Sequence, residues 1–180
     1  LNMRDTSQAD ITIKATGHQW KWGYDYLKGE GEGIRFLSLT TTPAEQIRGA
    51  AVKGGNYLLE VDRHVVVPVG KKVRVLTTAT DVIHSWWVPA LAVKQDAIPG
   101  YVRDTWFKAE KEGIYRGQCA ELCGKDHAFM PVVVEVVSAE KWQDLLPGRT
   151  EEPGREGLCG QLCGLPPGQR QGTAARFPGA

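Results

Sequence analysis

The segment Ile11-Thr-Ile-Lys-Ala-Thr-Gly-His-Gln-Trp-Lys-Trp-Gly-Tyr-Asp-Tyr26 carries the clearest structural pattern in the chain. From Ile11 to Thr16 apolar and polar residues alternate, and from Trp20 onward an aromatic residue stands at every second position. Successive side chains of a β-strand point to opposite faces, so a period of two indicates a strand with one face toward a core. We therefore expect strands at Ile11–Thr16 and Gln19–Tyr26.

The same kind of pattern continues along the chain. Runs rich in β-branched and aromatic residues are separated by Gly or Pro, which favours short strands joined by turns. The further expected strands are Tyr57–Asp62, Val65–Val67, Lys72–Thr78, Val82–Val88, Thr105–Lys108, Ile114–Arg116 and Val132–Val137. Only Ser138–Leu146 has a helical pattern, with Ser138 as its N-cap, and Gly29–Gly33 is expected to be an exposed loop. The pattern predicts an all-β sandwich or small barrel with a short C-terminal helix.

The composition is that of an ordinary globular protein. A length of 180 residues is enough for one domain with a substantial core. A formal net charge of +1 lacks the basic excess of a general nucleic-acid binder, so we expect no nucleic-acid partner. After Leu146 the sequence becomes rich in Gly and Pro and loses its periodicity. We therefore expect one domain over residues 1–146 and a disordered tail over 147–180.

No stretch approaches the roughly 18 consecutive apolar residues that a membrane-spanning helix needs. The polar start of the chain also lacks the apolar run of a signal peptide. Because the first residue is Leu1 and not Met, we interpret the chain as a fragment of a longer protein, itself soluble. The missing membrane segments then say little about the parent protein.

The segment Gly117-Gln-Cys-Ala-Glu-Leu-Cys-Gly-Lys-Asp-His-Ala-Phe-Met130 concentrates the side chains of two Cys, one His and one Met. Soft sulfur ligands with an imidazole select copper or zinc over magnesium or calcium. A zinc site of two Cys and two His would give Met130 no role, whereas copper accepts thiolate, imidazole and a weak Met ligand together. A single blue copper needs only one thiolate, so the second indicates a dinuclear centre with bridging sulfurs.

Two other interpretations of this segment stay open. One is a zinc site that stabilises a binding module, and the other is a disulfide between Cys119 and Cys123, the ordinary use of an even cysteine count in an exported protein. A metal site would also need a second imidazole. Of the candidates His18, His64 and His84, the last lies in an apolar stretch, where a buried His needs a partner or a metal.

Four segments, taken in order, resemble cytochrome c oxidase subunit II over about residues 10–146. They are Gly17–Tyr26 with its aromatics, Asp81–Trp86 around a His, Asp96–Gly100, and Cys119–Met130, which is similar to the dicopper loop of that family. The resemblance implies a cupredoxin-like Greek-key β-barrel or sandwich, consistent with the predicted strands. It also implies a subunit of a terminal oxidase that accepts electrons from cytochrome c and passes them to haem in subunit I, where oxygen is reduced to water.

The resemblance further implies a role for individual residues. The implied ligands of two copper ions are His84, Cys119, Glu121 through its carbonyl, Cys123, His127 and Met130. The two thiolates would bridge the ions, and Met130 and the Glu121 carbonyl would be weak ligands. The side chain of Glu121 would reach a magnesium ion at the junction with subunit I. Trp20 matches the aromatic residue through which electrons enter. Apart from the resemblance, Asp25, Glu60, Asp62 and Asp81 are candidates for an acidic face that steers a basic cytochrome c, with an ordinary solvated surface as the alternative for each of them.

The resemblance places the domain on the periplasmic face of a bacterial inner membrane, or the intermembrane-space face of a mitochondrial one, anchored by a membrane hairpin that this chain lacks. Two related alternatives are the dicopper domain of nitrous oxide reductase and a metal-free quinol oxidase subunit. The strand with Trp20 and the segment Asp96–Gly100 favour the oxidase over the first, and the retained Cys and His residues disfavour the second. The pair Cys159 and Cys163 has no His or Met after it, and we interpret it as non-functional.

Overall fold

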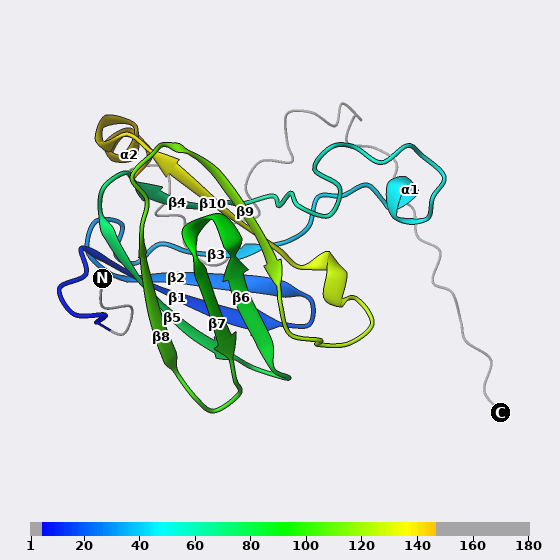
Figure 1. Ribbon diagram of the computed structural model, residues 1–180, viewed down its shortest axis with the longest axis horizontal. Coiled ribbons are helices and arrows are strands. Elements are labelled where there is room, and N and C mark those ends of the chain that lie inside the picture. Colours follow the sequence, from blue (N-terminus) through cyan, green and yellow to red (C-terminus); the bar gives the residue numbers. More distant parts are fainter. Residues whose placement is uncertain (1–4, 147–180) are drawn as a thin grey trace, which may run out of the picture.

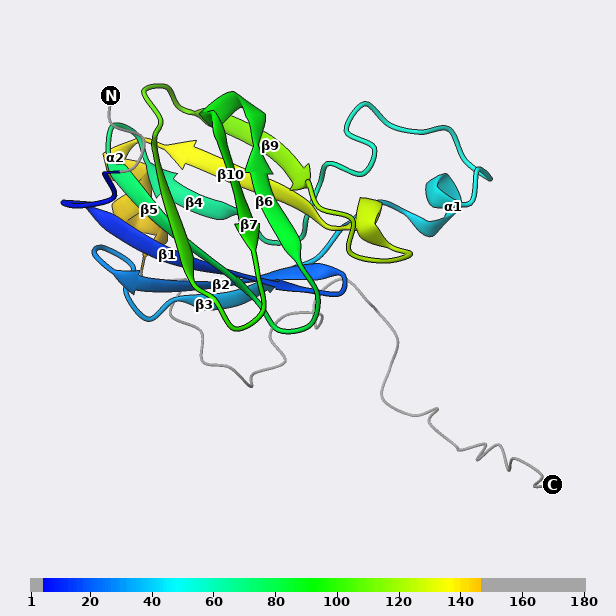
Figure 2. The same cartoon turned by 60° about the horizontal axis from the view of Figure 1, so that its bottom comes forward.

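The computed structural model describes residues 5–146, which form a sandwich of two five-stranded β-sheets (Figures 1 and 2). The first sheet has the order β3 (Arg35–Ser38), β2 (Lys21–Lys28), β1 (Ile11–His18), β5 (Lys72–Ala79), β8 (Arg103–Lys108). The second has the order β4 (Val65–Pro68), β10 (Pro131–Val137), β9 (Gly113–Cys119), β6 (His84–Val88), β7 (Val93–Ala97). Both sheets are mixed, because β1 pairs with β5 and β10 with β4 in parallel, while the other pairs are antiparallel.

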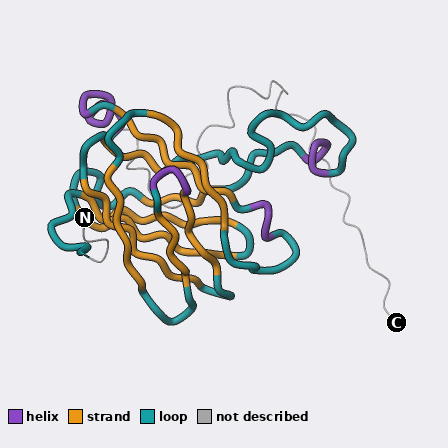
Figure 3. The backbone as a smooth tube through the Cα atoms, in the orientation of Figure 1, coloured by secondary structure: helices purple, strands orange, loops and turns teal. Residues whose placement is uncertain are grey.

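Helices are short and lie outside the sheets (Figure 3). They are α1 (Ala44–Ile47), the 3₁₀ turns η1 (Pro89–Leu91) and η2 (His127–Phe129), and α2 (Ala139–Leu145). The connection that contains α1 projects from the same end of the sandwich as η2 (Figures 1 and 2). Among residues 5–146 no helix is long and apolar enough to span a lipid bilayer.

The core lies between the two sheets and is built from alternate residues of the strands. In β5, for example, every second side chain is buried, as the period of two requires. Two polar bridges join the layers: the hydroxyl of Tyr26 donates to the carbonyl of Val66 at 2.7 Å, and the indole of Trp86 donates to the hydroxyl of Tyr24 at 3.2 Å. Buried aromatic groups thus satisfy their polar atoms inside the core.

Helix α2 closes one end of the sandwich. Ser138 caps it by accepting a hydrogen bond from the backbone N–H of Lys141 at 3.2 Å, as expected from the sequence. Trp142 is fully buried, stacks on Tyr26, and donates its indole N–H to Glu30 in the β2–β3 turn at 2.8 Å. This contact anchors the helix to the first sheet.

The predicted all-β sandwich with a short C-terminal helix is confirmed, with corrections to individual strands. The strand expected at Tyr57–Asp62 is wrong: Leu58 has a positive φ of 60°, and only Val61 forms an isolated bridge, to Thr40. The strand expected from Val82 begins at His84, because the Val82 N–H bonds to the Asp81 side chain in a turn. Strands β3 and β7 were not predicted. The expected tail over 147–180 lies outside the described residues.

Candidate metal centre

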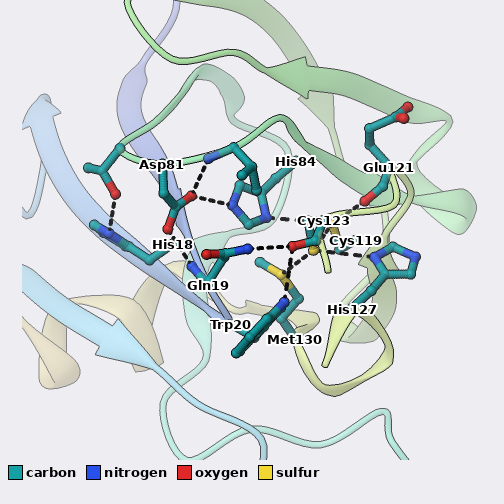
Figure 4. A network of polar contacts seen from close by, with 12 residues as sticks. His18, Gln19, Trp20, Asp81, His84, Cys119, Glu121, Cys123, His127 and Met130 are labelled. Atoms are coloured by element: carbon teal, nitrogen blue, oxygen red, sulfur yellow. Dashed lines mark hydrogen bonds and ion pairs between the residues drawn. The ribbon is translucent and has the colours of Figure 1, made fainter. Parts of the chain in front are cut away.

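The residues singled out by the sequence meet at one end of the second sheet (Figure 4). His84 is the first residue of β6 and Cys119 the last of β9, so the two neighbouring strands bring them together. The following loop leaves the sheet, bonded from the N–H of Ala120 to the carbonyl of Ser85 at 3.0 Å. The loop returns to the sheet at Met130, just before β10. The carbonyl of Met130 accepts from the N–H of Cys119 at 3.4 Å.

The candidate donor atoms lie within contact of one another. The Sγ atoms of Cys119 and Cys123 are 3.9 Å apart, and His84 Nδ1 is 3.9 Å from the Cys119 sulfur. On the other side of the pair, His127 Nδ1 is 3.4 Å and Met130 Sδ 3.5 Å from the Cys123 sulfur. The carbonyl oxygen of Glu121 is 3.3 Å from the Cys119 sulfur. All six residues expected to be ligands therefore converge, with the two sulfurs in the middle.

The ring of His84 is held in one orientation. It is fully buried, its Nε2 donates to Asp81 Oδ1 at 2.8 Å, and its Nδ1 therefore faces the sulfurs. The indole of Trp22 packs edge-on against it at 5.9 Å, and Gly17 lies so close that a Cβ there would sit 2.6 Å from the ring. A carboxylate behind a candidate His ligand fixes which nitrogen is offered to a metal.

The pKa values show how the metal-free cluster distributes charge. Burial opposes ionisation of Cys119, but its hydrogen bonds with His84, with the backbone at Ser85 and Glu121, and with Cys123 together outweigh burial and lower the pKa of that thiol. Burial alone would lower the pKa of His84, but the contacts of its ring with Cys119 and Asp81 together raise that pKa. For Cys123, burial and then the charge on Cys119 raise the pKa of the thiol to about 12. Charge on one sulfur thus opposes ionisation of the other, and cations between them would stabilise two thiolates.

The donor set fits copper. Both described cysteines are free, at an Sγ–Sγ distance far beyond the roughly 2.05 Å of a disulfide, so the disulfide interpretation is not what the structure shows. The Met130 side chain is buried and its sulfur faces Cys123, which a zinc site would not use. Two buried thiolates with imidazole and thioether are the soft donors that copper accepts.

Trp20 and Gln19 lie over the ligand loop from the first sheet, in the turn between β1 and β2 (Figure 4). The indole N–H of Trp20 donates to the carbonyl oxygen of Cys123 at 3.2 Å, and the side-chain amide of Gln19 donates to the same oxygen at 2.9 Å. Trp20 is half-buried, and Lys125 lies over its ring at 5.7 Å. Trp22, by contrast, is fully buried and belongs to the core.

The other two histidines lie elsewhere. His18 is half-buried, and its Nδ1 is 2.8 Å from the hydroxyl of Thr80. His64 is 3.2 Å from Glu135. By contrast, a ring nitrogen of His84 and the sulfurs of Cys119 and Cys123 all lie within 4.8 Å of one another. The geometry therefore agrees with the expectation that His84 is the imidazole partner of the Cys loop.

A family model described as "Cytochrome C oxidase subunit II, periplasmic domain" matches residues 11–137. The chain belongs to the cytochrome c oxidase subunit II family. Two similar subunit II proteins are those of Cereibacter sphaeroides, 45% identical over 84% of this chain, and of Metridium senile, 47% identical over 78%. Each alignment covers 54% of the relative, so the chain spans about half the length of the curated subunit II proteins it matches.

Solved subunit II structures have the same fold. The periplasmic domain of subunit II of cytochrome oxidase (CoxB) of Bradyrhizobium japonicum superposes with a TM-score of 0.69 at 46% identity, covering 79% of this chain and 94% of that one. A second is subunit II in a mixed disulfide intermediate with a thioredoxin-like protein, TlpAs, with a TM-score of 0.65 at 44% identity, covering 83% of this chain and 97% of that one.

Sequence reasoning missed two supports of the subunit II centre. The sequence indicates Asp81 as a surface charge in the segment around His84 and Gln19 as the start of a strand, but it does not indicate that Asp81 holds the His84 ring or that Gln19 bonds to Asp81. The apolar setting of His84 did signal that a partner was needed. Nothing in the sequence indicated that Gln19, over a hundred residues before Cys123, would contact its carbonyl.

Proposed function

We propose that this chain is the electron-accepting domain of a cytochrome c oxidase, taking electrons from cytochrome c and passing them to haem in subunit I, where oxygen is reduced to water. The isolated chain would be an electron carrier and not the oxygen-reducing site. The observation that carries the proposal is the convergence of two buried free thiols, two imidazoles and a thioether in a chain of this family.

The residues that would hold two copper ions are His84, Cys119, Glu121 through its carbonyl, Cys123, His127 and Met130. When bound, copper would supply a redox centre that accepts and releases single electrons. The protein keeps both sulfurs and the ring of His84 away from water, and Asp81 directs Nδ1 of that ring inward. A rigid, dry donor set is suited to fast electron exchange because few groups rearrange.

We propose that electrons reach this centre at Trp20. The half-buried indole reaches the surface on one side and bonds to the Cys123 carbonyl on the other, so it spans the distance between a docked partner and a ligand. Of the carboxylates expected to steer cytochrome c, Asp25 is paired with Lys14 and Arg35, and Glu60 with Arg116. Asp62 accepts a hydrogen bond from the N–H of Leu39, and Asp81 accepts one from the N–H of Gln19 in the turn that carries Trp20, so Asp81 lies beside the proposed docking point.

The magnesium role of Glu121 stays a proposal. Its carbonyl faces the sulfurs while the residue is exposed, so the carboxylate is free to face another subunit. We further propose the periplasmic or mitochondrial intermembrane-space face of the membrane as the location, since the matching family model is named for a periplasmic domain. The mixed disulfide of a similar subunit II with a thioredoxin-like protein suggests that such a protein also acts on Cys119 or Cys123 here.

Copper reconstitution tests the proposal. The full chain, loaded with copper and dialysed, should contain two copper ions and show a purple colour with the electron paramagnetic resonance spectrum of an electron shared by two coppers. A blue protein with a single copper, or zinc retained against excess copper, would refute it. Nitrous oxide reductase and quinol oxidase subunits are set aside by the family match.

A further inference from the structure

One residue that is not a candidate ligand connects the two halves of the metal centre. The side-chain amide of Gln19 donates to the carbonyl oxygen of Cys123 at 2.9 Å, and its backbone N–H donates to Asp81 Oδ2 at 2.7 Å. The other oxygen of Asp81 accepts from His84 Nε2 at 2.8 Å. We propose that Gln19 is a positioning residue that clamps the Cys123 loop to the support of His84, which fixes the spacing of the donors; the metal part of this inference rests on the proposed function.

The two halves need such a connection because they are anchored differently. His84 and Cys119 belong to paired strands, β6 and β9, whose backbones are fixed by ladder hydrogen bonds. Cys123 lies within the loop that joins β9 to β10, bonded to the sheet near its ends, at Ala120 and Met130. In the middle of the loop the carbonyl of Cys123 accepts from Gln19 and Trp20. A shift of this carbonyl would move the Cys123 sulfur, which shares its Cα.

Packing shows that the clamp is closely fitted. A Cβ on Gly124 would lie 3.1 Å from the Gln19 amide nitrogen and 3.0 Å from the Trp20 ring. The loop backbone therefore lies directly against both side chains. Gln19 as a whole is exposed, but its bond to the loop is partly buried, and this protects the bond from competition with water. Trp20 donates a second hydrogen bond to the same carbonyl oxygen, and this bond is 0.3 Å longer than the one from the Gln19 amide.

The chemistry of the clamp separates it from simple packing. Gln19→Met keeps the length of the side chain and removes the donor, while Gln19→Glu keeps the shape and places an acceptor against the carbonyl oxygen. A clamp that works by donation should be weakened by the first change and weakened more by the second. Gln143→Met is the matched control. Gln143 lies in α2, and its side-chain amide also donates one hydrogen bond, to Glu30 at 3.0 Å.

The first measurement uses the metal-free full chain. Alkylation by iodoacetamide is followed by mass spectrometry of the tryptic peptide of residues 117–125, which carries Cys119 and Cys123 and is distinct from the peptide with Cys159 and Cys163. Gln19→Met should react about fivefold faster than wild type, the effect expected for one hydrogen bond, with Gln19→Glu faster still and Gln143→Met unchanged. Wild-type rates in both Gln19 variants, or equal acceleration in both, would overturn the proposal.

The second measurement uses the copper-loaded chain. Release of copper to an excess chelator should follow the same order, and the copper hyperfine pattern should differ from wild type in both Gln19 variants only. A purely structural role would leave that pattern unchanged. If wild type takes up no copper, the proposed function fails while the alkylation rates still decide the clamp. If Gln19→Met does not fold by circular dichroism, Gln19→Glu against wild type decides.

Discussion

Replacing Gly17 by Ala tests how tightly the first sheet is packed against the metal centre. Gly17 lies in β1 with an ordinary strand conformation, and a Cβ there would be 2.6 Å from Cδ2 and 2.8 Å from Cγ of His84. Ordinary contacts begin at 3.4 Å, so the approach is short by about 0.8 Å. Alanine is acceptable to the strand backbone, and the substitution therefore isolates the steric effect.

The ring of His84 has little freedom to give way. It is fully buried, bonded to Asp81 at 2.8 Å, and flanked by Trp22. Either the ring leaves its carboxylate or β1 separates from the second sheet. Overpacking of this kind costs about 1–3 kcal/mol of unfolding free energy. Gly55 is the control, because nothing lies within 4 Å of a Cβ at that position, and Gly55→Ala should stay within about 0.5 kcal/mol of wild type.

Urea unfolding of the metal-free chain measures both effects, and a double-mutant cycle identifies the cause. In a His84→Ala background the obstructing ring is absent and only the Cβ of residue 84, 3.0 Å from the new methyl group, remains, so Gly17→Ala should cost much less there. The copper-loaded Gly17→Ala chain should also lose copper more readily than wild type. A destabilisation of the same size in both backgrounds would refute the reasoning, since the cost would then arise from something other than the His84 ring.

Three further predictions concern separate parts of the molecule. Cys123→Ser should abolish the dinuclear centre, because a hydroxyl cannot supply a soft bridging anion, whereas Met130→Leu should keep copper and change its potential; metal analysis and redox titration distinguish them. Trp20→Ala should slow electron transfer from reduced cytochrome c by orders of magnitude in stopped-flow experiments with copper loading unchanged, and an unchanged rate would show that electrons enter elsewhere. Burial would raise the pKa of Glu135, but the contacts of its carboxylate with Lys141 and His64 together outweigh burial and hold the pKa below 4.5. The resulting stability is present above pH 4.5 and is lost as the pH falls through the lower folded value, so Glu135→Gln should flatten the acid side of the unfolding curve, and an unchanged acid side would contradict this.

The sequence predicted those strands whose one face is buried. Ile11–Thr16 alternates because its apolar residues face the core, and β1 occupies that position. Strands β3 and β7 escaped prediction because they are short and show no sustained apolar alternation: Val93–Ala97 reads Val-Lys-Gln-Asp-Ala, with three polar residues in succession. The false strand Tyr57–Asp62 has strand-like residues, but the Leu58 carbonyl is used by Gln118 and not by a ladder.

For the site, the sequence could predict donor types but not their supports. The spacing of Cys119, Cys123, His127 and Met130 falls within one loop, so local order alone brings these residues near one another. Choosing His84 required the further argument that a His in an apolar stretch needs a partner. The roles of Gln19 and Asp81 depend on hydrogen bonds that join the β1–β2 turn to the β5–β6 and β9–β10 loops, across sequence separations that no local pattern encodes.

Strand β10 also determines how the domain could be attached to a conducting surface. It runs from Pro131, next to Met130, to Val137, next to the cap of α2, and seven residues of strand span roughly 20 Å. Helix α2 and the first described residues both lie at the end of the sandwich away from η2 (Figures 1 and 2). A linker joined at either of these places would hold the ligand loop facing outward into the electrolyte. Direct wiring to an electrode would instead require a contact engineered beside Trp20.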